Sequence, residues 1–201
     1  MVVRCGDWNI KKTSEPKKYQ EKQVKTLSIH PRYSGIDKVH NDVALVHLAE
    51  EFVLDNHLDT ICLPEFPDQR DGNYKKGKLD CSVQGWGKDS FGEDGSYQAA
   101  MRQINLPVVE NDVCQNLLRK TRLPNNFDLH DSFLCAGGSS KGGEDACEGD
   151  GGGPLVCRQN DKYVYFYEFV RVLSPPSILM GIPLNALVLN TVCNRGDTLQ
   201  I

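Results

Sequence analysis

Short apolar segments separated by glycine and proline are the feature that most constrains this fold. Apolar and polar residues alternate over 24–29 and again over 104–109, which is typical of half-buried β-strands. Residues 43–46 form a continuous apolar run of the kind found in buried strands. The 18 glycines and 10 prolines are scattered along the chain, and no long stretch keeps an apolar period of 3.6 residues. These patterns exclude a helical bundle and predict an all-β barrel or sandwich.

One segment, 110–122, favours a helix. Asn111 is a candidate N-cap, and Val113, Leu117 and Leu118 fall on one face at helical spacing. The glycine-rich stretch 136–153 predicts a long shaped loop, a kind of segment that often carries function.

Length and charge narrow the function classes. The chain has 201 residues, which suits one domain or two halves that share one chain. With 23 Lys and Arg against 27 Asp and Glu, the net charge is −4, which argues against nucleic acid as a partner. The most apolar stretch, 178–189, contains glycine and proline and is too short to span a bilayer. We therefore expect no membrane partner, and we expect 178–189 to be a core strand or a misfitted tail.

Eight cysteines at wide spacing predict disulfides formed in an oxidising compartment, and hence a secreted protein. A zinc site would need cysteine pairs two to four residues apart, and the sequence has none. No apolar leader follows Met1, so a signal peptide is expected on an upstream segment unless the start is a gene-model artefact. The cysteines are Cys5, Cys62, Cys81, Cys114, Cys135, Cys147, Cys157 and Cys193.

Residues 145–157 read DACEGDGGGPLVC. This segment closely resembles the nucleophile loop of trypsin/chymotrypsin-like serine proteases, D-A-C-x-G-D-S-G-G-P-L-V-C, with Gly151 where that family carries serine. Four more segments resemble the family in the same order along the chain. They are NDVALVHL at 41–48, ICLP at 61–64, CSVQGWG at 81–87 and FLCAG at 133–137.

The resemblance covers about residues 1–163 and implies a trypsin-like antiparallel fold of two barrels, with the first strands of barrel one and the last strands of barrel two missing or divergent. It implies a partial first barrel over 1–64, an interdomain linker over 65–78 and a partial second barrel over 79–163. The remaining 164–201 is a divergent tail, which we ascribe either to translated intron sequence or a frame change, or to genuine divergence.

The resemblance also implies roles for single residues around the nucleophile. Gly151 has no side chain, so no covalent acyl-enzyme can form on it. Asp145 falls where the family has a carboxylate at the floor of the substrate pocket that recognises Arg or Lys. The N–H groups of Gly149 and Gly151 correspond to oxyanion donors. Asp150 matches the aspartate that pairs with a new N-terminal amine in active members, and we expect it to lack that partner here.

Asp42 matches the triad aspartate and is interpreted as a relict. The family's A-A-H-C motif with the catalytic histidine does not occur before Asp42. We expect His47, His57 and His130 to be surface histidines.

Two disulfides are implied by the resemblance, Cys81–Cys157 and Cys114–Cys135. In many relatives the cysteine at the position of Cys62 bridges to an N-terminal propeptide or clip domain, so we expect a bridge from Cys62 to a segment that this chain lacks.

A calcium loop follows the G-[ED]-W strand in some family members, and Asp7, Asn9 and Glu15 occupy that region here. Because no second carboxylate cluster strengthens this reading, calcium is the weaker interpretation, and we otherwise expect no metal and no cofactor.

The arthropod clip-domain serine protease homologues, in which the active serine is glycine, are the most similar subset. The resemblance lies in residues 2–9 and 52–64. It implies a secreted, catalytically inactive cofactor that binds proteins of an extracellular immune cascade such as prophenoloxidase activation. Two alternatives stay open: an active trypsin-like endopeptidase with a sequence error at Gly151, and a non-functional truncated product.

Overall fold

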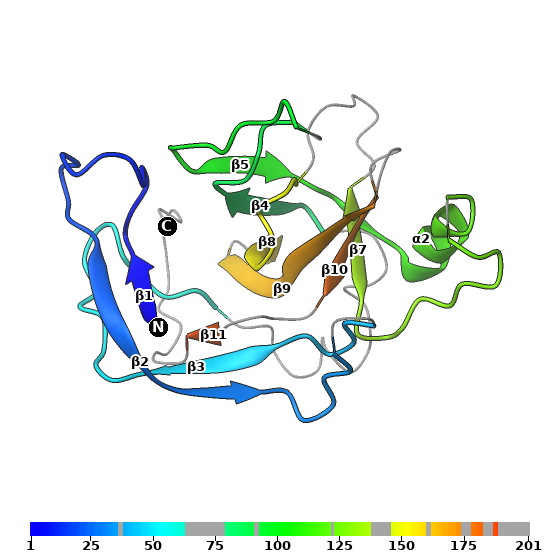
Figure 1. Cartoon of the computed structure of the whole chain (residues 1–201), viewed down its shortest axis with the longest axis horizontal. Helices are drawn as coiled ribbons and strands as arrows, with labels where there is room; N and C mark the ends of the chain where they lie inside the picture. The colour runs from blue at the N-terminus through cyan, green and yellow to red at the C-terminus, as the bar shows by residue number, and fades with distance from the viewer. Residues whose placement is uncertain are drawn as a thin grey trace.

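The structure is a computed structural model, and the residues that it describes form two β-sheets and a short helix (Figure 1). Nearly all of the regular structure is strand, so the prediction of an all-β fold is confirmed. The expected linker, 65–78, lies outside the described residues. The structure describes residues 1–35, 38–62, 79–90, 93–121, 123–137, 146–159, 162–173, 178–182 and 187–188.

The first sheet has the strand order β1-β2-β3-β11. Strands β1 (Val2–Cys5), β2 (Gln20–Ile29) and β3 (Ala44–Leu48) are successive antiparallel neighbours, and β11 (Leu187–Val188) pairs with β3 in parallel. The strands predicted over 24–29 and 43–46 correspond to parts of β2 and β3. On β3 the side chains of Ala44 and Val46 are buried, as their alternate positions on one face require.

The second sheet has the order β5-β4-β8-β9-β10-β7-β6, and all of its neighbours are antiparallel. The expected boundary between residues 163 and 164 falls inside β9, which pairs with both β8 and β10. The strands are β4 (Cys81–Gly85), β5 (Arg102–Asn105), β6 (Val108–Val109), β7 (Leu134–Gly137), β8 (Gly153–Gln159), β9 (Lys162–Leu173) and β10 (Ile178–Ile182).

The single strand predicted over 104–109 is wrong, because two strands occupy this segment. β5 ends at Asn105 and pairs with β4, whereas β6 begins at Val108 and pairs with β7. Between them Pro107 has no N–H to donate to a ladder. Its carbonyl accepts a hydrogen bond from Gly137 N at 2.9 Å, which turns the chain from one edge of the sheet to the other.

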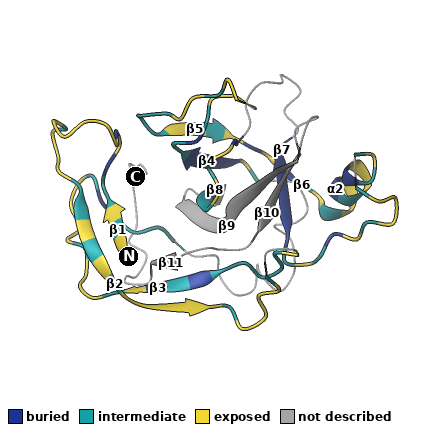
Figure 2. Cartoon of the chain, in the orientation of Figure 1, coloured by how far each residue is buried: buried dark blue, intermediate teal, exposed yellow. Residues whose placement is uncertain are grey.

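The main core lies in the second sheet, where the buried residues gather on β4 and β7 (Figure 2). Val83, Leu106, Leu134 and Leu155 are at most 2% exposed. A second cluster lies beneath the helix α2 (Asn111–Leu118) and contains Cys114, Leu118, Leu129, Phe133 and Cys135.

The helix is shorter than predicted, and its buried face differs. Glu110 rather than Asn111 is the N-cap, and no side chain caps the first turn. Cys114 and Leu118 are fully buried, whereas Val113 and Leu117 are 48% and 37% exposed. The disulfide from Cys114 to β7 fixes which face of the helix is turned inward, and hydrophobicity alone did not reveal this.

Both disulfides that the resemblance implies are present, Cys81–Cys157 and Cys114–Cys135. Cys81 and Cys157 are directly opposite each other on β4 and β8. Cys62 is also disulfide-bonded in this structure of the single chain, so the expected bridge from Cys62 to a segment that the chain lacks is not confirmed. In the described part of the chain, Cys5 and Cys147 are free thiols.

Contacts after β1 and before β3 join the two sheets. After β1, Trp8 O accepts hydrogen bonds from Met101 N at 2.9 Å and from Trp86 Nε1 at 3.1 Å. Before β3, Asn41 N donates to Ser132 Oγ at 3.3 Å. Among the described residues, no helix is both long and apolar enough to cross a membrane.

Candidate functional site

Asp150 organises the loop that leads into β8. Its Oδ1 accepts a hydrogen bond from Gly87 N at 2.7 Å, and its Oδ2 accepts one from Cys147 N at 2.9 Å. Its own N–H donates to Cys147 O, and its carbonyl accepts from Gly153 N, both at 3.0 Å. The expectation that Asp150 lacks an amine partner stays untested, but the structure shows that both carboxylate oxygens already have backbone donors. The carboxylate therefore ties this loop to the turn after β4.

Two glycines in the CSVQGWG segment leave room for this carboxylate. A Cβ atom added at Gly85 or at Gly87 would collide with the Asp150 side chain. The spacing of these glycines is thus explained by the close approach of the half-buried Asp150 carboxylate, and unusual backbone angles are not needed.

The neighbouring Gly149 is held against Tyr97. Gly149 has φ +97°, and a Cβ placed there would lie 2.6 Å from Cε1 of Tyr97. Tyr97 OH donates to Glu148 Oε1 at 2.9 Å, and Lys88 Nζ lies 2.7 Å from Glu148 Oε2. Both bonds lower the pKa of the Glu148 carboxyl, and the bond from Lys88 has the larger effect. We call Lys88, Tyr97 and Glu148 the loop clamp.

The loop clamp was not predicted from the sequence. Lys88 and Tyr97 belong to the segment between β4 and β5, outside the recognised motifs, and Glu148 stands at a variable position of the motif. Lys88 and Tyr97 are brought side by side by an isolated antiparallel bridge, and no pattern in the sequence predicts this bridge.

The other predicted site residues are distributed as follows. Gly151 is exposed in the turn before β8. Asp42 is half-buried and lies just before β3, outside the strand itself, and burial raises the pKa of its carboxyl. Asp42 takes no part in the contacts of Asp150 described above. Asp145 lies outside the described residues.

Chemically, the arrangement can position backbone N–H groups but supplies no attacking atom at residue 151. The loop from 147 to 153 is held at both ends by hydrogen bonds to Asp150, and Tyr97 of the loop clamp lies against the exposed Gly149. A glycine in its exposed turn adds neither an oxygen nor a sulfur nucleophile.

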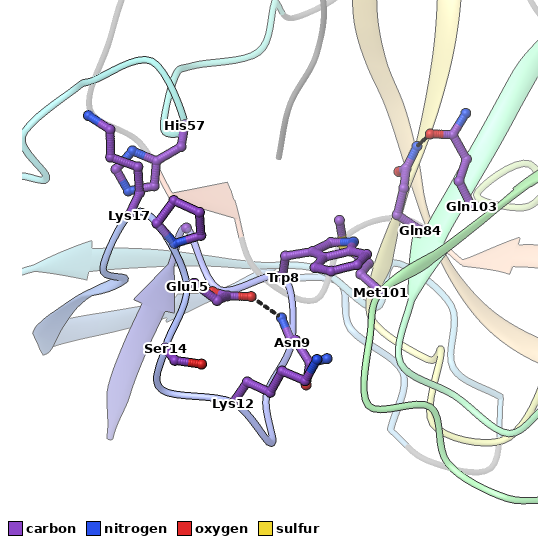
Figure 3. Close-up of a pocket in the computed structure, with 12 residues that line it drawn as sticks. Trp8, Asn9, Lys12, Ser14, Glu15, Lys17, His57, Gln84, Met101 and Gln103 are labelled. Carbon is purple, nitrogen blue, oxygen red and sulfur yellow. Dashed lines mark hydrogen bonds between the residues drawn. The ribbon is translucent and has the colours of Figure 1, made fainter.

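A cavity of about 590 Å³ lies elsewhere, between the segment after β1 and the edge formed by β4 and β5 (Figure 3). Figure 3 shows the Trp8 indole beside Met101, and Gln84 Nε2 donates to Gln103 Oε1 at 3.3 Å. None of Asp42, Gly149, Asp150 and Gly151 lines it. The lining residues are Gly6, Trp8, Asn9, Lys12, Ser14, Glu15, Pro16, Lys17, His57, Gln84, Met101 and Gln103.

The residues of the expected calcium loop are engaged with one another and with neighbours. Glu15 Oε1 accepts from Asn9 N at 2.8 Å, and Asp7 Oδ2 pairs with Arg4 at 2.9 Å. Within the described ranges, no three His, Cys, Asp or Glu residues come together in a way that could hold a metal ion. Calcium binding by this segment stays a prediction.

Two of the three histidines expected on the surface are half-buried. His47 is exposed, but His57 Nε2 lies 3.1 Å from Lys18 O, and the His130 ring stacks on His40. The surface assignment is therefore wrong for His57 and His130, because each ring is packed where two segments meet.

Substitution of Gly149 by alanine is expected to lower the free energy of unfolding by about 2–3 kcal/mol. The change adds a methyl group against Tyr97 and forces alanine into a left-handed backbone. Gly35→Ala is the matched control, because Gly35 has φ +83° but no atom within 4 Å of an added Cβ. It should cost about 1 kcal/mol. Equal losses in urea-induced unfolding would contradict the packing of Tyr97 on Gly149.

The chain matches the trypsin family model over residues 1–174. It is 39% identical over 155 residues to phenoloxidase-activating factor 2 of Galleria mellonella, an alignment covering 77% of this chain and 48% of that protein. It is 37% identical over 158 residues to the inactive CLIP domain-containing serine protease A28 of Anopheles gambiae, covering 79% and 39%. It is 38% identical over 164 residues to the inactive CLIP domain-containing serine protease A3 of Aedes aegypti, covering 80% and 32%.

The chain thus spans less than half the length of each of these relatives. The family match and the paired sheets with their two disulfides agree, and the chain belongs to the trypsin family, with CLIP-domain serine proteases and their inactive homologues among its relatives.

Proposed function

We propose that this protein is a secreted, non-catalytic member of the trypsin family that acts by binding proteins of an extracellular proteolytic cascade. The observation that carries the proposal is Gly151, which stands at the position of the nucleophilic serine within a loop sequence that otherwise matches the family. A covalent acyl-enzyme needs an oxygen or sulfur atom at that position, and glycine supplies none.

The loss of rate expected without a nucleophile is too large for this protein to act even as a weak protease. Removal of the nucleophile from a serine protease lowers kcat by about 10⁶-fold, which corresponds to roughly 8 kcal/mol of transition-state stabilisation. Binding and oxyanion donors alone leave about 10³–10⁴-fold acceleration over water, too little for useful proteolysis.

His30 and His40, the two histidines of this chain that precede Asp42, are both engaged in structural contacts. His30 Nδ1 accepts a hydrogen bond from Arg32 N at 3.1 Å within its own turn. His40 stacks on His130 with ring centroids 3.9 Å apart. Neither arrangement resembles a base that is oriented by an aspartate toward a nucleophile.

The names of the relatives support the cascade. One is a phenoloxidase-activating factor and several are called inactive CLIP serine proteases. Widely spaced disulfides, of which Cys81–Cys157 and Cys114–Cys135 are formed, agree with an extracellular site of action. The Asp150 carboxylate still holds its loop by hydrogen bonds although the loop carries no nucleophile, and this supports a role of the loop surface in binding.

A reconstituted activation assay tests this proposal. Prophenoloxidase and its activating protease are mixed with and without the purified protein, and phenoloxidase activity is measured. The protein should raise the yield of active phenoloxidase, and pretreatment with a fluorophosphonate should leave its effect unchanged. Gly151→Ala, which also lacks a nucleophile, is the matched variant and should act like the wild type. A cofactor effect that the fluorophosphonate abolishes, or no effect at any ratio, would contradict the proposal.

A further inference from the structure

The second contact between the sheets is built around two histidines. The rings of His40 and His130 stack with centroids 3.9 Å apart and planes inclined by 13°. The buried Phe133 ring meets both edge-on, with its centroid 5.5 Å from His40 and 6.2 Å from His130. We call residues 39–41 and 130–133 the histidine junction.

Hydrogen bonding within the histidine junction requires His130 to be neutral. Ser132 N–H donates to His130 Nδ1 at 3.1 Å, and Ser132 Oγ lies 2.8 Å from the same nitrogen. A backbone N–H can only donate, so Nδ1 must carry a lone pair and the ring proton must be on Nε2. Ser132 Oγ in turn accepts from Asn41 N at 3.3 Å. The bond between the two sheets thus runs through an oxygen that is itself oriented by the neutral imidazole.

The surroundings of His40 oppose its protonation. Burial, His130 and Lys38 all lower the pKa of His40. Two carboxylates are close by in the sequence: Asp42 follows on the same segment and Asp131 lies between His130 and Ser132, and neither is without a partner. The turn before the junction carries His30 and Arg32.

The helix meets the junction at Phe133. Asn111 Nδ2 donates to Phe133 O at 3.3 Å, and Cys114 and Leu118 belong to the cluster that contains the Phe133 ring. The Arg119 guanidinium donates to Phe127 O at 2.7 Å.

The backbone beside His40 is strained. Val39 has φ +50° and Asn41 has φ +52°, a left-handed conformation that is uncommon for any residue except glycine and unusual for a β-branched one. It is maintained by Val39 N bonding to Gly35 O and by His40 N bonding to Ser34 Oγ, each at 2.8 Å. Strain of this kind persists only while the surrounding contacts hold it. Loss of the contacts at Ser132 would therefore favour release of the segment.

We propose that the histidine junction is a pH-sensitive latch between the two sheets, closed when both imidazoles are neutral and opened when His130 takes up a proton. A proton on Nδ1 removes the acceptor for Ser132 N–H and turns the Ser132 hydroxyl, and a second proton on His40 places two like charges face to face. This device goes beyond the proposed function and does not depend on it.

The sign of the pH dependence follows from proton binding. The lowered pKa of His40 means that the open form binds more protons than the closed form at pH values just below the ordinary histidine value of 6.5. The stability of the closed junction is therefore full above about pH 6.5 and falls as the solution becomes more acidic.

Amide hydrogen exchange at Asn41 and Ser132 tests the latch in the whole chain. Between about pH 7.5 and about pH 5, protection corrected for intrinsic rates should fall at least ~10-fold in the wild type. In His130→Asn the carboxamide oxygen still accepts from Ser132 N–H but does not titrate, so protection should change less than ~3-fold. His47→Asn, on the exposed position of β3, is the matched control and should keep the wild-type response. Equal wild-type protection at both pH values, or a full response in His130→Asn, would overturn the proposal.

Two further measurements apply if His130→Asn does not fold. His40→Phe keeps a ring on His130 but removes one titrating group, so log protection should still fall in acid, but less steeply than in the wild type. Nitrogen-15 NMR of the wild type near neutral pH should show His130 protonated on Nε2. An unchanged slope, or a proton on Nδ1, would refute the latch.

Discussion

Removal of the Cys81–Cys157 bridge is expected to lower the free energy of unfolding by about 4 kcal/mol. The two cysteines are 76 residues apart in sequence, and a cross-link over a loop of this size restricts the unfolded chain strongly. The bridge also joins β4 to β8 at the centre of the larger core, where Cys157 is fully buried. Urea-induced unfolding of the double variant Cys81→Ala/Cys157→Ala measures the loss.

The second disulfide gives the matched comparison. Cys114 and Cys135 are both fully buried but only 21 residues apart, so their double alanine variant should lose about 3 kcal/mol. If the longer-range pair cost less than the shorter-range pair, loop closure would not be the source of the stabilisation.

Substitution of Asp150 by alanine is expected to cost about 3 kcal/mol. The change leaves the N–H groups of Gly87 and Cys147 without the carboxylate that accepts from both, and hydrogen bonds to a charged group are each worth about 1.5–3 kcal/mol. It also removes the side chain that packs closely against Gly85 and Gly87. Thermal unfolding measures the stability, and hydrogen exchange at the two amides reports the loop.

Two controls separate the role of this carboxylate from a general charge effect. Asp150→Asn keeps one accepting oxygen and should lose about half as much stability as the alanine variant. Asp128→Ala removes an exposed carboxylate and should change stability by less than about 0.5 kcal/mol. An Asp150→Ala variant as stable as Asp128→Ala would show that the loop is held by other contacts.

Strands were predictable from the local pattern, although burial does not follow it everywhere: on β2, Leu27 and Ile29 are 48% and 59% exposed. The alternation over 24–29 and the apolar run over 43–46 mark real strands, since these residues pair within one sheet. For the segment 104–109 the pattern predicted one strand, but its residues belong to two. The strands before and after Pro107 lie at opposite ends of the strand order of the sheet. The buried face of α2 was also predicted wrongly at Val113. The disulfide at Cys114, and not the hydrophobic pattern, determines which face of α2 is turned inward.

Site residues were predictable only where they belong to a recognised sequence motif. The motif identified Asp150 and the glycines around it, but it did not reveal that the Asp150 carboxylate binds the N–H groups of Gly87 and Cys147. The loop clamp and the histidine junction depend on residues that are 51 and 91 positions apart in the chain. Such pairs carry no periodic signal, so a single sequence cannot announce them.

The central claim is that no atom at residue 151 can attack a peptide bond, and active-site labelling tests it most directly. The purified protein and active trypsin are incubated side by side with a fluorophosphonate probe, and bound probe is measured by intact mass. The account predicts less than about one labelled molecule in a thousand under conditions that label trypsin fully. Stoichiometric labelling of this chain at its nucleophile loop would contradict the account.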